Sequence, residues 1–216
     1  LTSLAFPARS LTFDGKTFEN VATLETVTFA DSTNELVLNE SVFKGTAVSS
    51  LNFGNRLITF KKAALNKLAT LTSVIFGENA IIKQAEDEAF TGTSLTTVQI
   101  PAVENVSKFG NGVFGGISTL ESFTLAGNNT VHEVVDGVLY LKDGENLILI
   151  QVPAGKFDAQ DTFVLPDNVV TIKTYAFEGV TVDTVYTSAD SILATLEKDC
   201  FGYYVATLSC KVKTLV

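Results

Sequence analysis

The chain has 216 residues, 46% of them apolar and 18% charged, a composition typical of a folded protein and not of a disordered segment. The net charge is −9, there is no basic run, and no apolar stretch approaches about 20 residues, so we expect neither nucleic-acid binding nor membrane insertion. One histidine and two cysteines offer few ligands or nucleophiles, and we expect no catalytic residue, no metal site and no cofactor.

A six-residue pattern recurs along the whole chain. It reads LTSLAF at residues 1–6 and LETVTF at 24–29, and most of its copies start 22 to 25 residues apart. The fourth position is apolar throughout and the sixth in most copies, which is the alternation of a half-buried β-strand. The copies start at residues 1, 24, 48, 71, 95, 120, 160, 182 and 205.

A second apolar site recurs between these windows and indicates a corner of the chain. Val42-Phe43, Ala89-Phe90 and Ala176-Phe177 are typical pairs. A glycine often lies two residues after the aromatic, where a tight corner needs a residue that tolerates positive φ. These glycines are Gly45, Gly92, Gly116 and Gly179.

Each repeat therefore predicts one coil of a right-handed solenoid. We expect about nine coils, with one parallel β-sheet on one side and a less regular segment on the other. A single coil cannot bury both apolar sites alone, so neighbouring coils must stack. The phenylalanines should then form rows along the axis. Neither end shows a polar cap, so we expect residues 1–216 to be one domain cut from a longer array.

One interval breaks the rhythm, because the windows at 120 and 160 are 40 residues apart. Asp143-Gly144 lies there between two apolar runs, Val138–Leu141 and Leu147–Val152, which predicts a β-hairpin. We place this insertion at about residues 135–153. It would be either a lateral brace or a protruding binding element.

The repeats resemble the BspA-like leucine-rich repeats, which combine an aromatic corner with an LxxVxIP strand. IIKQAEDEAFTGTSLTTVQIP at 81–101 and VVTIKTYAFEGVTVDTV at 169–185 carry the resemblance. It implies a leucine-rich-repeat-like solenoid that is secreted or displayed on a cell surface and takes part in adhesion. We expect no asparagine ladder, because Asn52 and Asn55 have no obvious counterparts in phase.

The predicted strands suggest a binding surface. The third position of every window is Ser or Thr, a hydroxyl row that suits any exposed parallel sheet. The fifth position should also face solvent, but it varies, and a varied column on a rigid scaffold is a candidate for specificity. We take six of its members as candidate ligand-binding residues: Thr28, Asn52, Ile75, Gln99, Thr124 and Tyr186.

We interpret the protein as a non-enzymatic extracellular recognition or adhesion module. Its partner would be a host matrix or cell-surface protein, or a glycan, on a host or neighbouring cell. One alternative is a spacer that displays another domain. Another is a polysaccharide-acting solenoid enzyme, although the fifth column carries no charged residue for catalysis. The hairpin is a competing binding surface, but its mixed side chains are typical of a solvated turn: Tyr140, Lys142, Asp143 and Glu145.

Three smaller features have ordinary structural interpretations. We expect His132 to be a partly exposed strand residue. The acidic run at residues 86–88 lacks the spacing of a calcium loop and should be a solvated turn. Cys200 and Cys210 should both point inward, and buried free thiols are favoured over a disulfide because the two lie on different sides of the coil.

Overall fold

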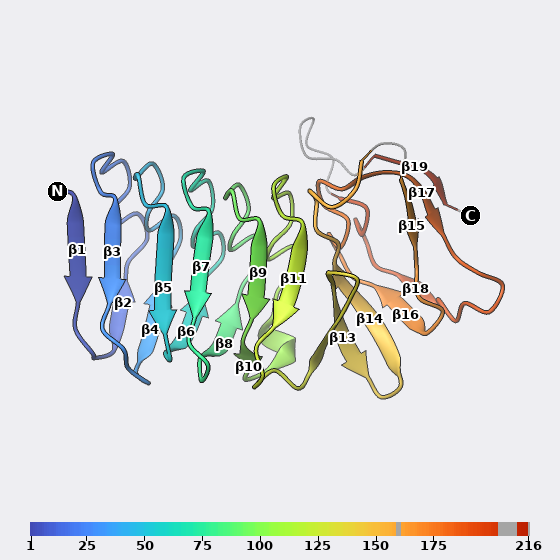
Figure 1. Ribbon diagram of the computed structural model, residues 1–216, viewed down its shortest axis with the longest axis horizontal. Helices are drawn as coiled ribbons and strands as arrows, with labels where there is room; N and C mark the ends of the chain where they lie inside the picture. Colours follow the sequence, from blue (N-terminus) through green and yellow to red (C-terminus); the bar gives the residue numbers. More distant parts are fainter. Residues whose placement is uncertain (159–160, 203–210, 216) are drawn as a thin grey trace.

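The chain folds into a β-solenoid, described in a computed structural model over residues 1–158, 161–202 and 211–215. Figure 1 shows the strands of one side, here called the front, standing side by side along the axis. These strands are β1 (Ser3–Phe6), β3 (Thr26–Phe29), β5 (Ser50–Gly54), β7 (Ser73–Phe76), β9 (Thr97–Ile100), β11 (Ser122–Leu125), β15 (Thr162–Val164), β17 (Thr181–Tyr186) and β19 (Lys211–Leu215).

The front strands coincide with eight of the nine predicted windows and are parallel and in register. Leu4 lies opposite Val27, Val27 opposite Leu51, and Leu51 opposite Val74. The hydrogen-bonded groups are β1-β3-β5-β7, β9-β11 and β15-β17-β19. The window at 205–210 lies outside the described residues, and the strand that pairs with β17 comes after it, at Lys211–Leu215.

The opposite side of the solenoid is a second parallel sheet, so the prediction of a single sheet is wrong. Its short strands bury apolar side chains such as Leu36, Leu38, Ile58 and Phe60. Back strands such as LITF at 57–60 and IIKQA at 81–85 do not alternate apolar and polar residues, so they lack the period-two signal of the front windows. In hydrogen-bonded order they are β2 (Leu11–Phe13), β4 (Glu35–Leu38), β6 (Leu57–Phe60), β8 (Ile81–Ala85) and β10 (Ala102–Val103), followed along the chain by the 3-10 helix η1 (Val106–Lys108).

Between the back and front strands, each coil turns at the predicted aromatic site. We call the stacked turns the corner row, and their central residues are Phe18, Phe43, Leu65, Phe90, Phe114, Phe177 and Phe201. The expected positive φ is confirmed at Gly45, Gly92, Gly116 and Gly179. A second positive φ, two residues before each central residue, was not foreseen. It falls on Lys16, Ser41, Ala63, Glu88, Gly112, Tyr175 and Asp199.

Phenylalanine rings run through the core as a ladder, which confirms the predicted rows. Phe6, Phe29, Phe53 and Phe76 stack face to face, with centroids 5.6, 6.0 and 5.4 Å apart. Each ring is the sixth residue of its window. The parallel register therefore places every ring directly over the preceding one.

The turns after the front strands carry a short ladder of polar side chains. The Asp31 carboxylate accepts hydrogen bonds from the Asn55 N–H and side-chain amide, at 3.0 and 3.2 Å. The Asn55 side-chain oxygen in turn accepts from the Asn79 N–H at 3.0 Å. The ladder is not one of asparagines that recur in phase, as expected. Asp31 holds the place equivalent to Asn55, and Asn79 lies one residue further from its strand and contributes only its backbone N–H.

A buried arginine ties the first coils together. Arg56 is fully buried, and its guanidinium donates to the carbonyl oxygens of Pro7, Arg9 and Ala30 at 2.9 to 3.0 Å. The guanidinium carbon also lies 5.9 Å from the centre of the Phe29 ring. One side chain therefore satisfies three carbonyls on two neighbouring turns.

The predicted hairpin is present, and it is built into the back of the solenoid. β12 (His132–Val135), β13 (Val138–Asp143) and β14 (Asn146–Gln151) form an antiparallel meander, and β14 then pairs in parallel with β16 (Val169–Ile172), which pairs with β18 (Thr195–Leu196). Tyr140 is buried, so the picture of a solvated side chain there is wrong. Figure 1 shows the turn that joins β13 to β14 at one edge of the solenoid.

The hairpin divides the core in two. On β13, Leu139 packs into the cluster of the preceding coils, whereas Val138 and Tyr140 pack into the cluster of the following coils. The front strands β11 and β15 do not pair, yet the corner row continues, since the Gly116 N–H donates to the Glu178 carbonyl at 2.9 Å. The insertion thus widens one coil without interrupting the corners. That residues 1–216 act as one domain stays a prediction.

Candidate functional site

The fifth-position column of the front sheet points outward as predicted. All six candidate residues are exposed, and the most apolar, Ile75, leaves 47% of its surface open. Pairing places Thr28, Asn52 and Ile75 on adjacent strands, and Gln99 beside Thr124. Figure 1 shows these strands, β3 to β11, as neighbours. Five of the six candidates therefore share one surface.

Tyr186 lies apart from that surface. It is 41% exposed and sits beside Val164 on the β15-β17 pair, beyond the inserted hairpin. The sequence gives equal weight to every window, so it could not show that the hairpin separates this tyrosine from the other five. Tyr186 and Val164 instead form a small apolar patch of their own.

Part of the column also serves the scaffold. The Asn52 side-chain oxygen accepts a hydrogen bond from the Gly54 N–H at 3.0 Å, where the register between β5 and β7 shifts. Thr28 reaches the Leu4 carbonyl at 3.5 Å. The side chains of Ile75, Gln99 and Thr124 form no hydrogen bond to the scaffold in the described part of the chain, and they are the members most suited to contact a partner.

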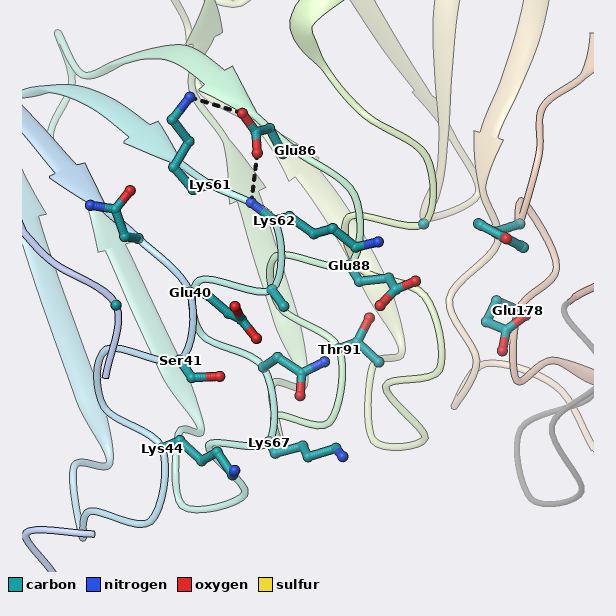
Figure 2. A pocket seen from close by; sticks show the side chains of 16 residues that line it. Glu40, Ser41, Lys44, Lys61, Lys62, Lys67, Glu86, Glu88, Thr91 and Glu178 are labelled. Carbon is teal, nitrogen blue, oxygen red and sulfur yellow. Dashed lines mark hydrogen bonds and ion pairs between the residues drawn. The ribbon is translucent and has the colours of Figure 1, made fainter. Parts of the chain in front are cut away.

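A second concave surface lies along the corner row, where the sequence did not point. It is a groove of about 950 Å³ that runs from Gly15 to Tyr175 and Glu178. Small residues form its floor: Ser41, Ala63 and Gly112. These are members of the row with positive φ that precedes each corner. Figure 2 shows charged side chains rising on both sides of this floor.

One charged pair in the groove belongs to the scaffold. The Glu86 carboxylate accepts from the Lys61 ammonium at 2.9 Å and from the Lys62 N–H at 2.8 Å (Figure 2). Burial opposes ionisation of Glu86, but these hydrogen bonds outweigh it, so the pKa of the carboxyl is lowered. The same arrangement recurs between Glu197 and Lys173. Neither Lys173 nor Glu197 lines the groove, so the repetition of this arrangement indicates a role in stacking the coils.

The acidic run at 86–88 is thus not a solvated turn as predicted. Its three side chains are half-buried, and Asp87 accepts a hydrogen bond from the Asn111 N–H at 2.8 Å. Stacking of the next coil covers the run. That cover comes from residues about 24 positions away, which the local sequence does not show.

Two lysines of the groove are not engaged in this way. Lys62 and Lys67 are exposed, and neither forms an ion pair within 4.0 Å among the residues that the structure describes. Lys44, which also lines the groove, forms an ion pair at 2.9 Å with Glu19, which does not line it. Three lysines within residues 61–67 and the glycine-rich stretch at 110–116 include residues that line this surface, but neither is distinctive enough in sequence to predict it.

His132 is buried, not partly exposed as predicted. Its ring is 1% exposed and lies 5.5 Å from the Phe109 ring, and its Nδ1 is 3.2 Å from the Asn129 amide nitrogen. Burial lowers the pKa of the imidazole to about 4, and the charge of Lys142 acts in the same direction. The histidine is therefore a neutral core residue that anchors β12, and the inserted hairpin is what covers it.

The other features to consider are the cysteines, clusters of metal-ligating side chains and membrane-spanning helices. The Cys200 thiol is buried and free, and Cys210 lies outside the described residues. In the part of the chain that is described, no three His, Cys, Asp or Glu side chains gather as a metal site would require. Nor does any helix there have the length and apolar character to cross a membrane.

Comparison with known families agrees with this architecture. Residues 1–121 and 156–214 match the BspA type leucine rich repeat region in six copies. The chain belongs to this family. The unmatched stretch, 122–155, contains the inserted hairpin. A search of curated proteins found no relative of this chain.

Three solved structures share the fold of this BspA-type chain. A leucine rich cell surface protein from Faecalibacterium prausnitzii has a TM-score of 0.62 at 20% identity, covering 92% of this chain and 61% of its own. The pneumococcal vaccine antigen PcpA has a TM-score of 0.69 at 16% identity, covering 99% and 58%. A leucine-rich repeat protein from Eubacterium ventriosum has 0.55 at 18%, covering 91% and 50%. The chain thus spans about half to three fifths of these proteins.

Proposed function

We propose that the protein is a non-enzymatic recognition module, secreted or held on a cell surface. Its partner is a protein or glycan of a host or neighbouring cell, bound by the front sheet. The observation that carries the proposal is the exposed, uncharged and varied column on β3 to β11, supported by a rigid core. Membership of the BspA-type family and the name of the Faecalibacterium protein support the location.

The column has the dimensions of a recognition patch. Adjacent parallel strands are about 4.8 Å apart, so the members from Thr28 to Thr124 extend over roughly 20 Å. That matches the centre of an interface of standard size. Amide and hydroxyl groups supply hydrogen bonds, and Ile75 supplies apolar contact near the middle. With no charged side chain in the column, a partner needs no matching charge there.

Binding to purified extracellular-matrix proteins, to glycan arrays and to intact epithelial cells tests the proposal. Ile75→Lys combined with Gln99→Lys should weaken any binding found by at least about tenfold, because it introduces two desolvated charges. Both side chains point away from the core, so the fold should be retained. Thr33→Lys with Thr130→Lys is the matched control, since it adds the same charge at exposed positions off the sheet.

A third variant decides between the sheet and the hairpin. It shortens the tip from Lys142 to Asn146. If a ligand is lost only on shortening the tip, the sheet assignment is wrong. Absence of binding to every probe would favour a spacer, and turnover of a glycan would favour an enzyme over a recognition module.

A further inference from the structure

We propose that the groove along the corner row is a second binding site, separate from the front sheet, and that it takes a neutral oligosaccharide. It occupies a different side of the coil from the candidate column. Its two ends are Gly15, in the first coil, and Tyr175, in a coil beyond the inserted hairpin. The stacking of Gly116 on Glu178 is what brings Tyr175 to this place.

The shape of the groove suits an extended chain. The corners at Phe18, Phe43, Leu65, Phe90, Phe114 and Phe177 stack in succession, and five steps of about 4.8 Å give a length of roughly 24 Å. Along the floor, Ser41 and Ala63 carry short side chains and Gly112 carries none, while the longer side chain of Glu88 stands between Ala63 and Gly112. The ligand would therefore lie along the axis in a shallow trough and would not enter a closed cavity.

The lining of the groove argues against a peptide. Peptides are held mainly by a few large side chains that fill apolar pockets. Here Ala63 and Tyr175 are the apolar and aromatic side chains of the lining, the stems of the lysines add further apolar surface, and the other side chains end in amides, hydroxyls, ammonium groups or carboxylates. A sugar presents hydroxyls that both donate and accept, at a spacing of a few ångströms. Such groups match a surface on which donors and acceptors alternate.

Donors and acceptors do alternate along the groove. Lys62 and Lys67 offer ammonium donors that have no ion-pair partner within 4.0 Å in the described chain, and Glu88 on the next coil offers acceptors. Figure 2 shows Lys62, Lys67, Glu88 and Thr91 around the same open space. A pair of neighbouring hydroxyls could donate to the carboxylate and accept from an ammonium group at once.

The charges of the groove point to a neutral ligand. Four lysines and four glutamates line it, so their formal charges cancel. The chain as a whole carries −9, which repels anionic chains at long range. Neither a sulfated glycan nor a basic peptide gains from such a surface.

Tyr175 is the aromatic residue among those that line the groove, and its side chain is half-buried. Sugar rings commonly stack on aromatic side chains. It has a φ of 62°, a conformation that is rare for a large aromatic residue. A Cβ atom at Gly112 would lie 3.1 Å from the Tyr175 Cβ, so the preceding coil leaves room for this side chain only by having glycine there. Tyr175, in a strained conformation beside the backbone of Gly112, forms one end of the groove.

The experiment is isothermal titration of the protein with a panel of neutral penta- and hexasaccharides of glucose, mannose, galactose and N-acetylglucosamine. Tyr175→Asn removes the ring and tolerates positive φ, so it should preserve the fold. Asn66→Ala with Lys67→Ala removes the donors of one coil. We expect binding of at least one sugar and a loss of about tenfold or more for each variant, as one or two hydrogen bonds or a stacking contact would give.

Two controls keep the result decisive. Lys198→Ala, at an exposed lysine outside the groove, should leave binding unchanged. The sheet variant Ile75→Lys with Gln99→Lys should also leave it unchanged. No binding by any member of the panel, or binding that both groove variants retain, would overturn this inference. Loss on the sheet variant alone would overturn it as well, but would support the sheet as a recognition surface.

Discussion

The coils before the inserted hairpin and those after it bury their aromatic side chains differently. Before the hairpin, four phenylalanines stack face to face with interplanar angles of 20° to 24°. After it, Phe163 meets Phe157 and Phe177 edge to face, at 88° and 89°. The sixth position, which carries the stacked rings, is already Ile100 and Leu125 in the two windows before the hairpin, and it is Leu165 and Thr187 after it. A ladder therefore persists only while every window supplies the same ring at the same place.

The later coils are also less completely covered. Val164 is 62% exposed, and Ile192 and Leu196 are 47% and 45% exposed. In the first four coils, by contrast, Asn55 and Arg56 link the turns that follow β1, β3, β5 and β7. The comparison indicates that regular repetition gives stability through many equivalent contacts, whereas the region after the insertion depends on local packing.

Removal of one ring of the ladder is the strongest way to test this difference. Phe53→Ala should reduce the free energy of unfolding by about 4 kcal/mol, because Phe53 contacts rings on both neighbouring coils and the cavity cannot collapse. Phe163→Ala should cost less, about 3 kcal/mol. Urea unfolding followed by circular dichroism measures both. Equal losses would contradict the proposed contrast.

Arg56 should be the next largest contributor. Arg56→Ala leaves the carbonyls of Pro7, Arg9 and Ala30 without their buried donor and should cost about 3 kcal/mol. The same urea titration applies. Arg9→Ala, at an exposed arginine in the same turn, should change stability by less than about 0.5 kcal/mol. If Arg56→Ala changed stability as little as Arg9→Ala, water would be replacing the guanidinium as the donor to these carbonyls.

Acid should weaken the junction between the two regions through His132. Its folded pKa of about 4 lies below the ordinary value of 6.5, so between these values the unfolded chain binds a proton that the folded chain excludes. Stability should therefore fall by about 2 to 3 kcal/mol as the pH drops from 6.5 to 4. Urea midpoints across this range measure the slope. His132→Gln should flatten it, and an unchanged slope would assign the effect to carboxylates.

The smallest effect concerns the corner row, which both regions share. Ala63 has a φ of 54°, a strained conformation for a residue with a Cβ atom. Ala63→Gly should therefore raise the unfolding free energy by up to about 1 kcal/mol. Ala47→Gly, outside the positive-φ positions, should lower it by a similar amount. Differential scanning calorimetry resolves both changes. Destabilisation by Ala63→Gly would show that its conformation carries no strain.

Much of this fold was accessible from sequence because its signals repeat. The strand windows, the glycine corners and the hairpin turn each appear several times or have a strong local signature, such as Asp143-Gly144. The back sheet was missed, since strands such as LITF at 57–60 do not alternate apolar and polar residues. The buried state of His132 was missed for another reason: the residues that cover it come from the distant Phe109 and from the inserted hairpin.

Of the two candidate sites, the sheet column could be predicted from sequence and the groove could not. The outward direction of Ile75 or Gln99 follows from alternation within one strand, so it could be predicted. The groove could not, because Lys62 and Tyr175 are more than 100 residues apart and meet only where the corner row passes the insertion. Neither residue is unusual in its own repeat. Their proximity depends on how coils stack, which single windows do not encode.

That uninterrupted corner row has a consequence for how the chain reaches its structure. Most contacts between neighbouring coils close a loop of about 24 residues, as from Lys67 to Thr91, whereas the contact from Gly116 to Glu178 closes one of 62. The longer loop costs about 0.8 kcal/mol more in chain entropy. Assembly of the solenoid should therefore propagate quickly within each run of coils and pause where the two runs join. The hairpin, which is local, would form before that step and present β14 as a ready edge for β16.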